Sequence, residues 1–311
     1  MDEGLTDTPE RGGHGGDKAG HVPVLLKEAI DFLAIRHGGT YIDATVGLGG
    51  HSLEIAKRLG APGHLIGLDK DPAALDVARA RLISSGGRGW PEVTLLHGSF
   101  AEIGERFASA SADGLLADLG VSSLQFDTPA RGFSFQAEGP LDMRMNPQAE
   151  PTAEQVVNHL DERELADLIY EFGEERRSRR IARAIVRSRP IRSTAELAAV
   201  VSAAARPVKQ AERRIHPATK TFQALRIFVN HELDDLRELL RAAWQVLKPG
   251  GRIVIISFHS LEDRIVKDAF RDGVSQGHYK LMTKKPVTAG EGEIGRNPRS
   301  RSAKMRAAER I

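Results

Sequence analysis

The feature that most constrains this fold is the stretch from Tyr41 to Ser52, which reads YIDATVGLGGHS. A short apolar run ends in an acidic residue, three glycines follow, and the next residues have a helical pattern. A strand, a glycine turn and a helix in succession are typical of a βαβ unit that brings backbone N–H groups against a ligand. Gly47, Gly49 and Gly50 have no Cβ, so the chain can turn tightly and approach that ligand closely.

The next apolar run begins at His64 and ends in Asp69. About twenty residues beyond such a loop, a carboxylate can accept hydrogen bonds from both hydroxyls of a ribose. The loop and Asp69 together therefore predict a nucleoside cofactor. The alternative is that the glycine turn serves only the packing of a helix on the sheet.

The loop also indicates which nucleoside cofactor to expect. A dinucleotide fingerprint would place a third glycine at position 52, after Gly47 and Gly49, but this chain has Ser52 there. Asp43 precedes the turn, and a carboxylate close to the cofactor attracts a cation and repels a pyrophosphate. S-adenosylmethionine carries a sulfonium and an ammonium group, whereas NAD carries a pyrophosphate. We therefore expect S-adenosylmethionine, and a nicotinamide-dependent oxidoreductase is the second hypothesis.

The composition is that of a soluble α/β protein. With 311 residues, 41 % of them hydrophobic, the chain can bury a substantial core in one or two domains. The absence of cysteine excludes disulfides, thiolate catalysis and cysteine–zinc sites, and it fits a reducing cytoplasm. Residues 1–20 are polar and Gly-rich, so we expect a disordered tail rather than a signal peptide. No apolar run approaches the roughly twenty residues that span a bilayer.

The formal charge of +2 conceals local asymmetry. Eight arginines lie between Arg176 and Arg192, and a second basic cluster lies between Arg296 and Arg306. Clustered arginine on an otherwise balanced chain indicates contact with a polyanion. The alternative is a solvated helix face on which Glu174 and Glu175 pair with the arginines.

Five short apolar runs alternate with helical patterns, which predicts a mostly parallel, doubly wound α/β sheet. The expected strands are Thr40–Asp43, His64–Asp69, Val93–His97, Gly114–Leu119 and Arg252–Phe258. The segment between the fourth and fifth strands is too long for one crossover helix, and its pattern is helical throughout. We therefore expect an inserted all-helical subdomain at residues 146–229, within a main domain formed by residues 21–145 and 230–311.

Helical periods and breaker residues give further expectations. Residues 161–185 and 220–247 have apolar residues at helical spacing, and a capping-box pattern begins another helix after Ser193. Residues 286–298 contain Gly and Pro and are expected to form a long loop. Residues 302–310 are expected to add a last strand or helix.

Ligands of open α/β sheets bind beyond the carboxyl ends of the strands, where the fourth run ends in Asp118. Amino-methyltransferases hold a target NH₂ group at this place with a polar residue and a tight turn. The exocyclic amine of a base is a weak nucleophile because its lone pair is delocalised into the ring, and hydrogen-bond acceptors restore its nucleophilicity. Asp118 is therefore the candidate catalytic residue. The alternative is that Asp118 caps the following turn.

Two other strand ends carry candidate residues. Phe100, after the third run, is placed to stack on an adenine, although core packing explains it equally well. His259, after the fifth run, is placed to meet a phosphate or the target base, whereas a buried or capping histidine is the commoner outcome. Ser260, Glu262 and Asp263 have the pattern of an ordinary helix start.

Several blocks of sequence make the interpretation specific, and chance accounts for one such block but not for the series. The blocks are HVPVLLKEA (21–29), DATVGLGGHS (43–52), DGLLADLGVSSLQ (113–125), RGFSF (131–135) with GPLDMRM (139–145), YEFGEE (170–175), HPATKTFQ (216–223) and ISFHSLEDR (256–264). In these blocks the chain resembles the RsmH (MraW) family, the bacterial 16S ribosomal RNA cytosine-N4 methyltransferases. The resemblance extends from about residue 21 to the C-terminus.

This resemblance implies a class I methyltransferase (Rossmann-like) fold and S-adenosylmethionine as the cofactor. His51 and Gln125 enter the site only through the resemblance, and Leu124 departs from a proline that is common in the family. No metal is implied, and no cluster of metal ligands is apparent. The implied cofactor contacts are Gly49, Gly50, His51, Asp69, Phe100, Asp118 and Gln125.

The implied substrate is a cytidine in the decoding centre of 16S ribosomal RNA, in the small ribosomal subunit. The arginines between Arg176 and Arg192, together with His216–Lys220, are then expected to contact phosphates of a folded RNA strand. A single base must be unstacked to enter the pocket, so Phe133 and Phe135 are candidate stacking partners, with core packing as the alternative.

A non-enzymatic hypothesis stays open beside the two enzymes. In it, the protein is an assembly or checkpoint factor that binds the small subunit and uses the cofactor only as a ligand. We expect a cytoplasmic protein without a membrane contact. The sequence leaves the oligomeric state open, a homodimer included.

Overall fold

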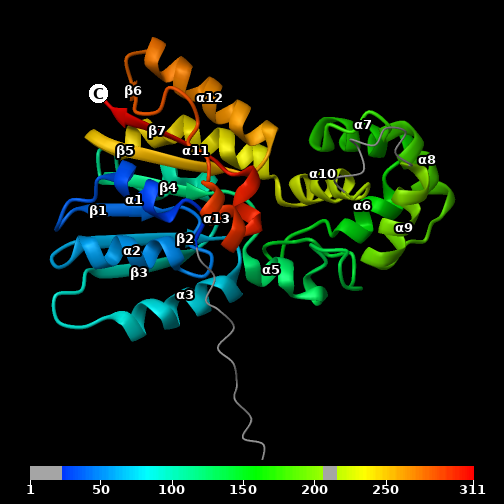
Figure 1. The fold of residues 1–311 in the computed structure, drawn as a ribbon, viewed down its shortest axis with the longest axis horizontal. Coiled ribbons are helices and arrows are strands. Elements are labelled where there is room, and N and C mark those ends of the chain that lie inside the picture. Colours follow the sequence, from blue (N-terminus) through cyan, green and yellow to red (C-terminus); the bar gives the residue numbers. More distant parts are fainter. Residues whose placement is uncertain (1–22, 206–215) are drawn as a thin grey trace, which may run out of the picture.

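The computed structural model describes residues 23–205 and 216–311, and its centre is a seven-stranded sheet (Figure 1). The strand order is β3-β2-β1-β4-β5-β7-β6, with parallel pairing among β1 to β5 and antiparallel pairing of β7 with β5 and β6. The doubly wound class I methyltransferase fold that we expected is confirmed. The strands are β1 Thr40–Asp43, β2 His64–Asp69, β3 Glu92–His97, β4 Ala112–Asp118, β5 Leu247–Ser257, β6 Tyr279–Leu281 and β7 Lys304–Arg310.

Alternate residues of each strand face two separate hydrophobic cores, because successive side chains point to opposite faces of a sheet. Tyr41 and Leu116 belong to one core, and their neighbours Ile42 and Leu115 belong to the other. Helices therefore cover both faces, as Figure 1 shows. On the first face they are α1 Leu26–Leu33, α2 Gly50–Leu59 and α3 Pro72–Ser85, and on the second they are α4 Ile103–Arg106, α11 Glu232–Val246 and α12 Ser260–Ser275.

The parallel register aligns the strand ends that carry the candidate residues. Asp69 on β2 pairs with His97 on β3, and Asp118 on β4 pairs with Ile256 on β5. Strands β1 and β4 are neighbours although β2 and β3 lie between them in sequence, so the winding direction reverses at β1. Ligands of doubly wound sheets bind at such a reversal, beyond the carboxyl ends of the strands.

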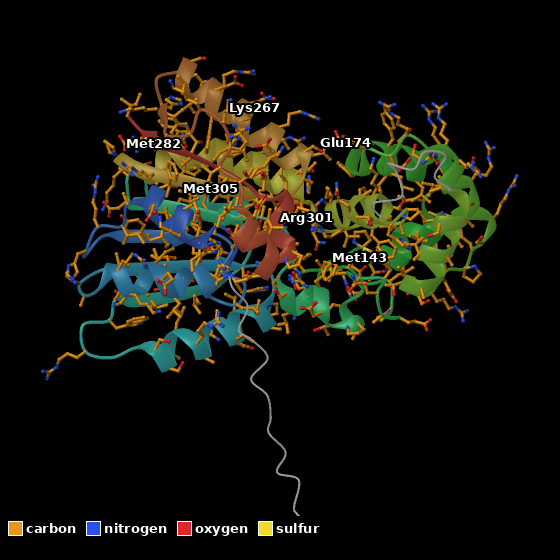
Figure 2. The ribbon with its side chains drawn as sticks, viewed as in Figure 1. Met143, Glu174, Lys267, Met282, Arg301 and Met305 are labelled. Atoms are coloured by element: carbon orange, nitrogen blue, oxygen red, sulfur yellow. The ribbon has the colours of Figure 1, made fainter. Side chains whose placement is uncertain are left out.

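Between β4 and α11 the chain forms a separate group of helices beside the sheet (Figure 1). These helices have their own hydrophobic core, which includes Ile169 and Leu225. That core also includes Phe133 and Met143, which precede the predicted boundary at residue 146; Figure 2 labels Met143 among these side chains. The domain bounds stay a prediction. The helices are α5 Ser123–Asp127, α6 Ala153–His159, α7 Glu162–Gly173, α8 Ser178–Arg187, α9 Thr194–Ala204 and α10 Thr219–Asn230.

Two of the predicted long helices are wrong, because each is interrupted by a residue in the left-handed conformation. Glu174 (φ +46°) separates α7 from α8, and His231 (φ +54°) separates α10 from α11. Gly173 is the last residue of α7 and gives the first break a signal in the sequence, whereas the break at His231 has no glycine or proline beside it. The capping box at Ser193 is present, since its side chain accepts a hydrogen bond from the N–H of Glu196.

The C-terminal expectations had mixed outcomes. The predicted loop at residues 286–298 contains a short helix, α13 (Glu291–Arg296). The last segment is the strand β7, in which the buried Met305 and Ala307 alternate with less buried neighbours. Strand β5 begins at Leu247, five residues earlier than predicted, because Lys248 to Gly251 continue the extended chain. The predicted tail, residues 1–20, lies outside the described residues.

Glu174 also connects the inserted helices to the main domain (Figure 2). One oxygen of its carboxylate lies 3.1 Å from Nη2 of Arg264 on α12, and the other accepts a hydrogen bond from the Ser260 hydroxyl. The pair with Arg264 is exposed to solvent, so its contribution to stability is small.

Candidate active site

The carboxyl edge of the sheet contains a cavity of about 580 Å³. It lies among the glycine loop after β1, the ends of β2 and β4, and the first turn of α12. Gly49 is the one predicted site residue outside the cavity lining. The predicted residues that line it are Gly50, His51, Asp69, Phe100, Asp118 and Gln125.

The glycine loop makes the tight turn that the sequence predicts. Gly47 adopts φ +51°, and its N–H donates a hydrogen bond to Oδ2 of Asp69 over 2.7 Å. Gly49 adopts φ +77° as the N-cap residue of α2, and a Cβ there would lie 3.2 Å from the Cβ of Ala78 on α3. Gly49 thus allows α2 and α3 to pack closely. A direct contact between Gly49 and the cofactor stays a prediction.

Asp43 and Ser52 form a fully buried pair behind the loop. Ser52 Oγ donates to Oδ2 of Asp43 over 2.5 Å, a hydrogen bond that the glycine of a dinucleotide fingerprint cannot make. Burial, together with the nearby charge of Asp69, raises the pKa of Asp43 to about 6. Asp43 does not line the cavity, so the loop separates this carboxylate from the place where we expected it, next to the cofactor.

Asp118 presents a carboxylate without a full set of partners. Its Oδ1 is buried and accepts no hydrogen bond from the described residues, and its Oδ2 lies 3.6 Å from Nδ1 of His51. Burial, followed by the charges of Asp43 and Glu262, raises the pKa of Asp118 well above its ordinary value. A buried acceptor without a donor is costly, so this position is complete only when a ligand supplies an N–H or O–H group.

His51 is fixed beside Asp118 by the N-terminal segment. Its Nε2 lies 3.1 Å from the carbonyl oxygen of Val24, so this nitrogen carries the proton and Nδ1 faces Asp118. The preceding Gly50 begins α2, and a side chain there would overlap the ring of Pro23. Gly50 therefore allows residues 23–24 to close over the start of α2 and hold the imidazole.

Asp69 holds the turn and still has free acceptor capacity. Its Oδ1 accepts from the N–H of Asp71 over 2.9 Å, and its Oδ2 accepts from Gly47. A carboxylate has about four lone-pair sites, so each oxygen can accept a further hydrogen bond from a ribose hydroxyl. Burial raises the pKa of Asp69 to about 6. Phe100 both lines the cavity and packs against the core of α11, so its two proposed roles are compatible.

Gln125 reaches the site through Asp71. The fully buried Asp71 accepts hydrogen bonds from Nε2 of Gln125 over 2.8 Å and from Nη1 of Arg131 over 2.7 Å. The other end of the Gln125 amide accepts from the N–H of Ser122 in a capping box. These bonds orient Gln125 at the cavity wall, and they bring Arg131, for which no role was predicted, close to the site.

The residues after β2 also contact both segments that connect the main domain to the inserted helices. Nη2 of Arg131 donates to the carbonyl of Met145 over 2.9 Å, at the start of the insertion. Nζ of Lys70 donates to the carbonyl of Asn230 over 2.6 Å, at its end. The side chain of Asn230 in turn accepts from the N–H of Met145 over 2.7 Å. Residues 69–71 thus link the predicted ribose site to the two chain segments that lead into and out of the inserted helices.

Arg226 and Glu232 were missed in the sequence; they line the cavity and form a cluster of charged residues with His259 and Glu262. Ligand atoms of Glu232, His259 and Glu262 lie within 4.8 Å of one another, close enough to hold a cation. However, Arg226 already forms two hydrogen bonds to Glu232, and Nδ1 of His259 accepts the N–H of Glu262, which leaves the proton on Nε2. The protonated Nε2 is no metal ligand, so this arrangement fits a network of ion pairs better than a cation site.

His259 has the commoner of its two expected roles. It is the N-cap residue of α12 and forms a capping box with Glu262. Burial acts to raise the pKa of Glu262, but the opposing effects of His259 and Arg226 hold it below the usual range. Glu262 is therefore ionised inside the cavity, where its charge acts on Asp118.

The comparison with known protein families agrees with this geometry. A family described as the MraW methylase family matches residues 18–311. The chain belongs to this family. A member named Ribosomal RNA small subunit methyltransferase H, from Koribacter versatilis (strain Ellin345), is 71 % identical over 303 residues, which cover 96 % of this chain and 97 % of that protein. The protein of the same name from Acidobacterium capsulatum is 61 % identical over 293 residues, covering 93 % and 98 %.

The chain is also similar to solved structures at low sequence identity. TrmN from Thermus thermophilus has a TM-score of 0.45 and 15 % sequence identity, over 92 % of this chain and 48 % of that one.

Within residues 23–205 and 216–311, no helix combines the length and the apolar character that a bilayer crossing requires.

The arginines that we expected to contact RNA lie mainly on the surface of this MraW-family chain. Six of the eight between Arg176 and Arg192 are exposed. Arg183 pairs with Glu162 over 3.2 Å, and Arg189 donates to backbone carbonyls at the end of α6. The exposed arginines remain candidates for phosphate contacts, whereas Arg189 has a structural role.

The two candidate stacking residues differ. Phe133 is buried in the core of the inserted helices, so of its two expected roles the structure shows core packing. Phe135 is only partly buried; its ring stacks on His216 with centroids 4.5 Å apart and meets Phe222 edge-on. His216 is exposed, so the pair forms an aromatic surface at the start of the predicted His216–Lys220 contact.

The buried position of Asp71 gives a first prediction. We expect Asp71→Ala to lower the free energy of unfolding by about 3–5 kcal/mol, because it leaves the Arg131 charge and the Gln125 amide unpaired. Chemical denaturation monitored by circular dichroism measures the change. Asp76→Ala on the same helix is the matched control: Asp76 is exposed and pairs only with Arg79, so a change within about 0.5 kcal/mol is expected. Equal effects of the two variants would contradict the structural role of Asp71.

Proposed function

We propose that this MraW-family protein transfers a methyl group from S-adenosylmethionine to the N4 amine of a cytidine in the decoding centre of 16S ribosomal RNA. The single observation that carries the proposal is the buried, unpartnered Oδ1 of Asp118 in the cavity at the carboxyl edge of the sheet. An amine N–H is the donor that this position lacks. The names of the relatives support the choice of a small-subunit ribosomal RNA as substrate.

The residues present fit the proposed cofactor. The turn at Gly47 and the remaining lone pairs of Asp69 suit a ribose, and Phe100 is placed to pack beside an adenine. Glu262, whose pKa lies below its usual range, and Asp69, whose pKa of about 6 leaves it ionised at neutral pH, give the cavity negative charge; this suits a sulfonium and an ammonium group better than the pyrophosphate of NAD. When bound, S-adenosylmethionine supplies an electrophilic methyl group.

The proposed chemistry requires little from the protein beyond positioning. Asp118 accepts a hydrogen bond from one N4 proton, which orients the amine lone pair along the line of transfer and raises its nucleophilicity. The methylated amine is cationic and acidic, so it loses a proton to water or to the Asp118 carboxylate, whose raised pKa suits a proton acceptor. No strong base is needed.

The surface beside the inserted helices suits a folded RNA substrate, and a protein that acts on ribosomal RNA is proposed to be cytoplasmic. Exposed arginines lie on α8, and Phe135, which stacks on His216, packs against the core of the inserted helices. Phosphate contacts position a strand, and stacking holds an unpaired base. The inserted helices are therefore proposed to hold the RNA strand from which the target base enters the cavity.

The experiment uses small ribosomal subunits that lack the modification. They are incubated with methyl-labelled S-adenosylmethionine and the full-length protein, and the RNA is digested to nucleosides. We expect labelled N4-methylcytidine at one position. Label in another nucleoside refutes the cytidine assignment, and subunit binding without transfer favours the assembly-factor hypothesis. Calorimetry with S-adenosylmethionine and NADH separates the two enzyme hypotheses.

A further inference from the structure

Arg226 extends from the inserted helices into the cavity of the main domain. It lies on α10, whereas its partner Glu232 is the first residue of α11. Nε of Arg226 donates to Oε1 of Glu232 over 2.8 Å, and Nη2 donates to Oε2 over 2.7 Å. Both residues line the cavity, and their side chains are 17 % and 9 % exposed. This is a nearly buried ion pair with two parallel hydrogen bonds.

The pairing leaves part of the guanidinium unused. Glu232 binds the edge formed by Nε and Nη2, and the described residues place no hydrogen-bond partner on Nη1. A bidentate carboxylate fixes the plane of a guanidinium, so the direction of the remaining N–H donors is set before any ligand arrives. Arg226 therefore offers rigid donors in a cavity whose other charged residues are mostly carboxylates.

Glu262 lines the same cavity as Arg226 and Asp118. Its carboxylate is held by the N–H of Phe258 over 2.8 Å and lies 3.1 Å from Nε2 of His259. Its charge acts to raise the pKa of both Asp118 and Arg226, and all three residues line the same cavity. One cavity is thus lined by an unpartnered acceptor, Asp118, a cationic donor, Arg226, and a fixed carboxylate, Glu262.

We propose that Arg226 is the residue that selects the base. Its Nη1 donates to the acceptor part of the cytosine edge, N3 and O2, while Asp118 accepts from the N4 amine; the inference rests on the proposed function. Cytosine presents a donor followed by two acceptors along this edge. Uracil presents O4 towards Asp118 and an N3–H towards Arg226, so both contacts become unfavourable. Glu232 is the positioning residue for Arg226.

The first test uses Arg226→Lys, which keeps a cation beside Glu232 but loses the second edge of donors. We expect kcat/KM for methyl transfer to small subunits to fall about 10- to 100-fold, the range for losing one good base contact. The dissociation constant for S-adenosylhomocysteine, measured by calorimetry, is expected to change less than threefold. Arg237→Lys, an exposed arginine of α11 paired with Asp234, is the matched control and is expected to have no effect.

The decisive test changes the base instead of the protein. Small subunits are reconstituted with 3-deazacytidine at the modified position, which removes the N3 acceptor. We expect this substitution to lower the transfer rate of the parent protein about tenfold or more and to have little further effect on Arg226→Lys. Losses that multiply, or an Arg226→Lys variant with normal kcat/KM, overturn the role of Arg226. Absence of transfer to unmodified cytidine by the parent protein refutes the proposed function itself.

Discussion

Replacing Asp118 by alanine is expected to lower the rate of methyl transfer about 10³-fold, which corresponds to about 4 kcal/mol of transition-state stabilisation. The variant loses the acceptor that orients the target amine, whereas the glycine loop and Asp69 stay intact. Single-turnover transfer to unmodified small subunits measures the effect. Asp118→Asn, which keeps the shape of the side chain, separates the loss of the charge from the loss of volume. An Asp118→Ala protein with normal transfer rates would exclude the assigned role.

The same variant is expected to be at least as stable as the parent at pH 7. Burial and the charges of Asp43 and Glu262 raise the pKa of Asp118, so the folded protein binds its proton more tightly than the unfolded chain. Stability therefore falls as the pH rises from the unfolded pKa of about 4 through the raised value. Removing Asp118 abolishes this loss, so urea denaturation at pH 7 favours the variant, and the difference shrinks in acid. A purely structural carboxylate would give the opposite result.

Asp69→Ala is expected to weaken cofactor binding about 100-fold, or about 2.7 kcal/mol, because hydrogen bonds from ribose hydroxyls to a carboxylate are lost together with the anchor of Gly47. Calorimetry with S-adenosylhomocysteine measures this change. The control is Glu92→Ala, on the neighbouring strand at the opposite edge of the sheet, where the carboxylate is exposed.

The pH dependence of binding gives a second readout for Asp69. Burial raises its pKa to about 6, and the ionised carboxylate is the stronger acceptor. The affinity of the parent protein is thus expected to fall as the pH falls through about 6, and this dependence is expected to be absent in Asp69→Ala. An unchanged dissociation constant in the variant would place the ribose elsewhere.

The sequence predicted those parts of the site that depend on strand ends. Parallel strands bring their carboxyl ends to one edge, so Asp69 and Asp118 were identifiable from apolar runs that end in an acidic residue. The cluster of Arg226, Glu232 and Glu262 was not identifiable in the sequence, because its members lie on three different helices. Their approach depends on the break at His231 between α10 and α11. That break has no glycine or proline signal, and tertiary packing determines it.

One sequence signal for Arg226 was present, although it was ambiguous. The residue lies between the buried Leu225 and Ile227, in a helix whose other residues give a regular apolar face. A charged residue in such surroundings indicates either a buried pair or a solvated position, and the spacing alone does not distinguish them. Phe133 was ambiguous in a similar way: the sequence allowed either stacking on a base or core packing, and the structure places it in the core.

The contacts of Lys70 and Asp71 mean that the domain with the predicted ribose site depends on the inserted helices for part of its structure. These residues reach partners 160 and 60 positions away, Asn230 and Arg131, at the two connections to the inserted helices. A shortened chain that lacks the insertion would leave the ammonium and the carboxylate beside the ribose site without their partners. The two parts of the protein are therefore constrained to vary together, and a transplant of the insertion between relatives has to carry both connections with it.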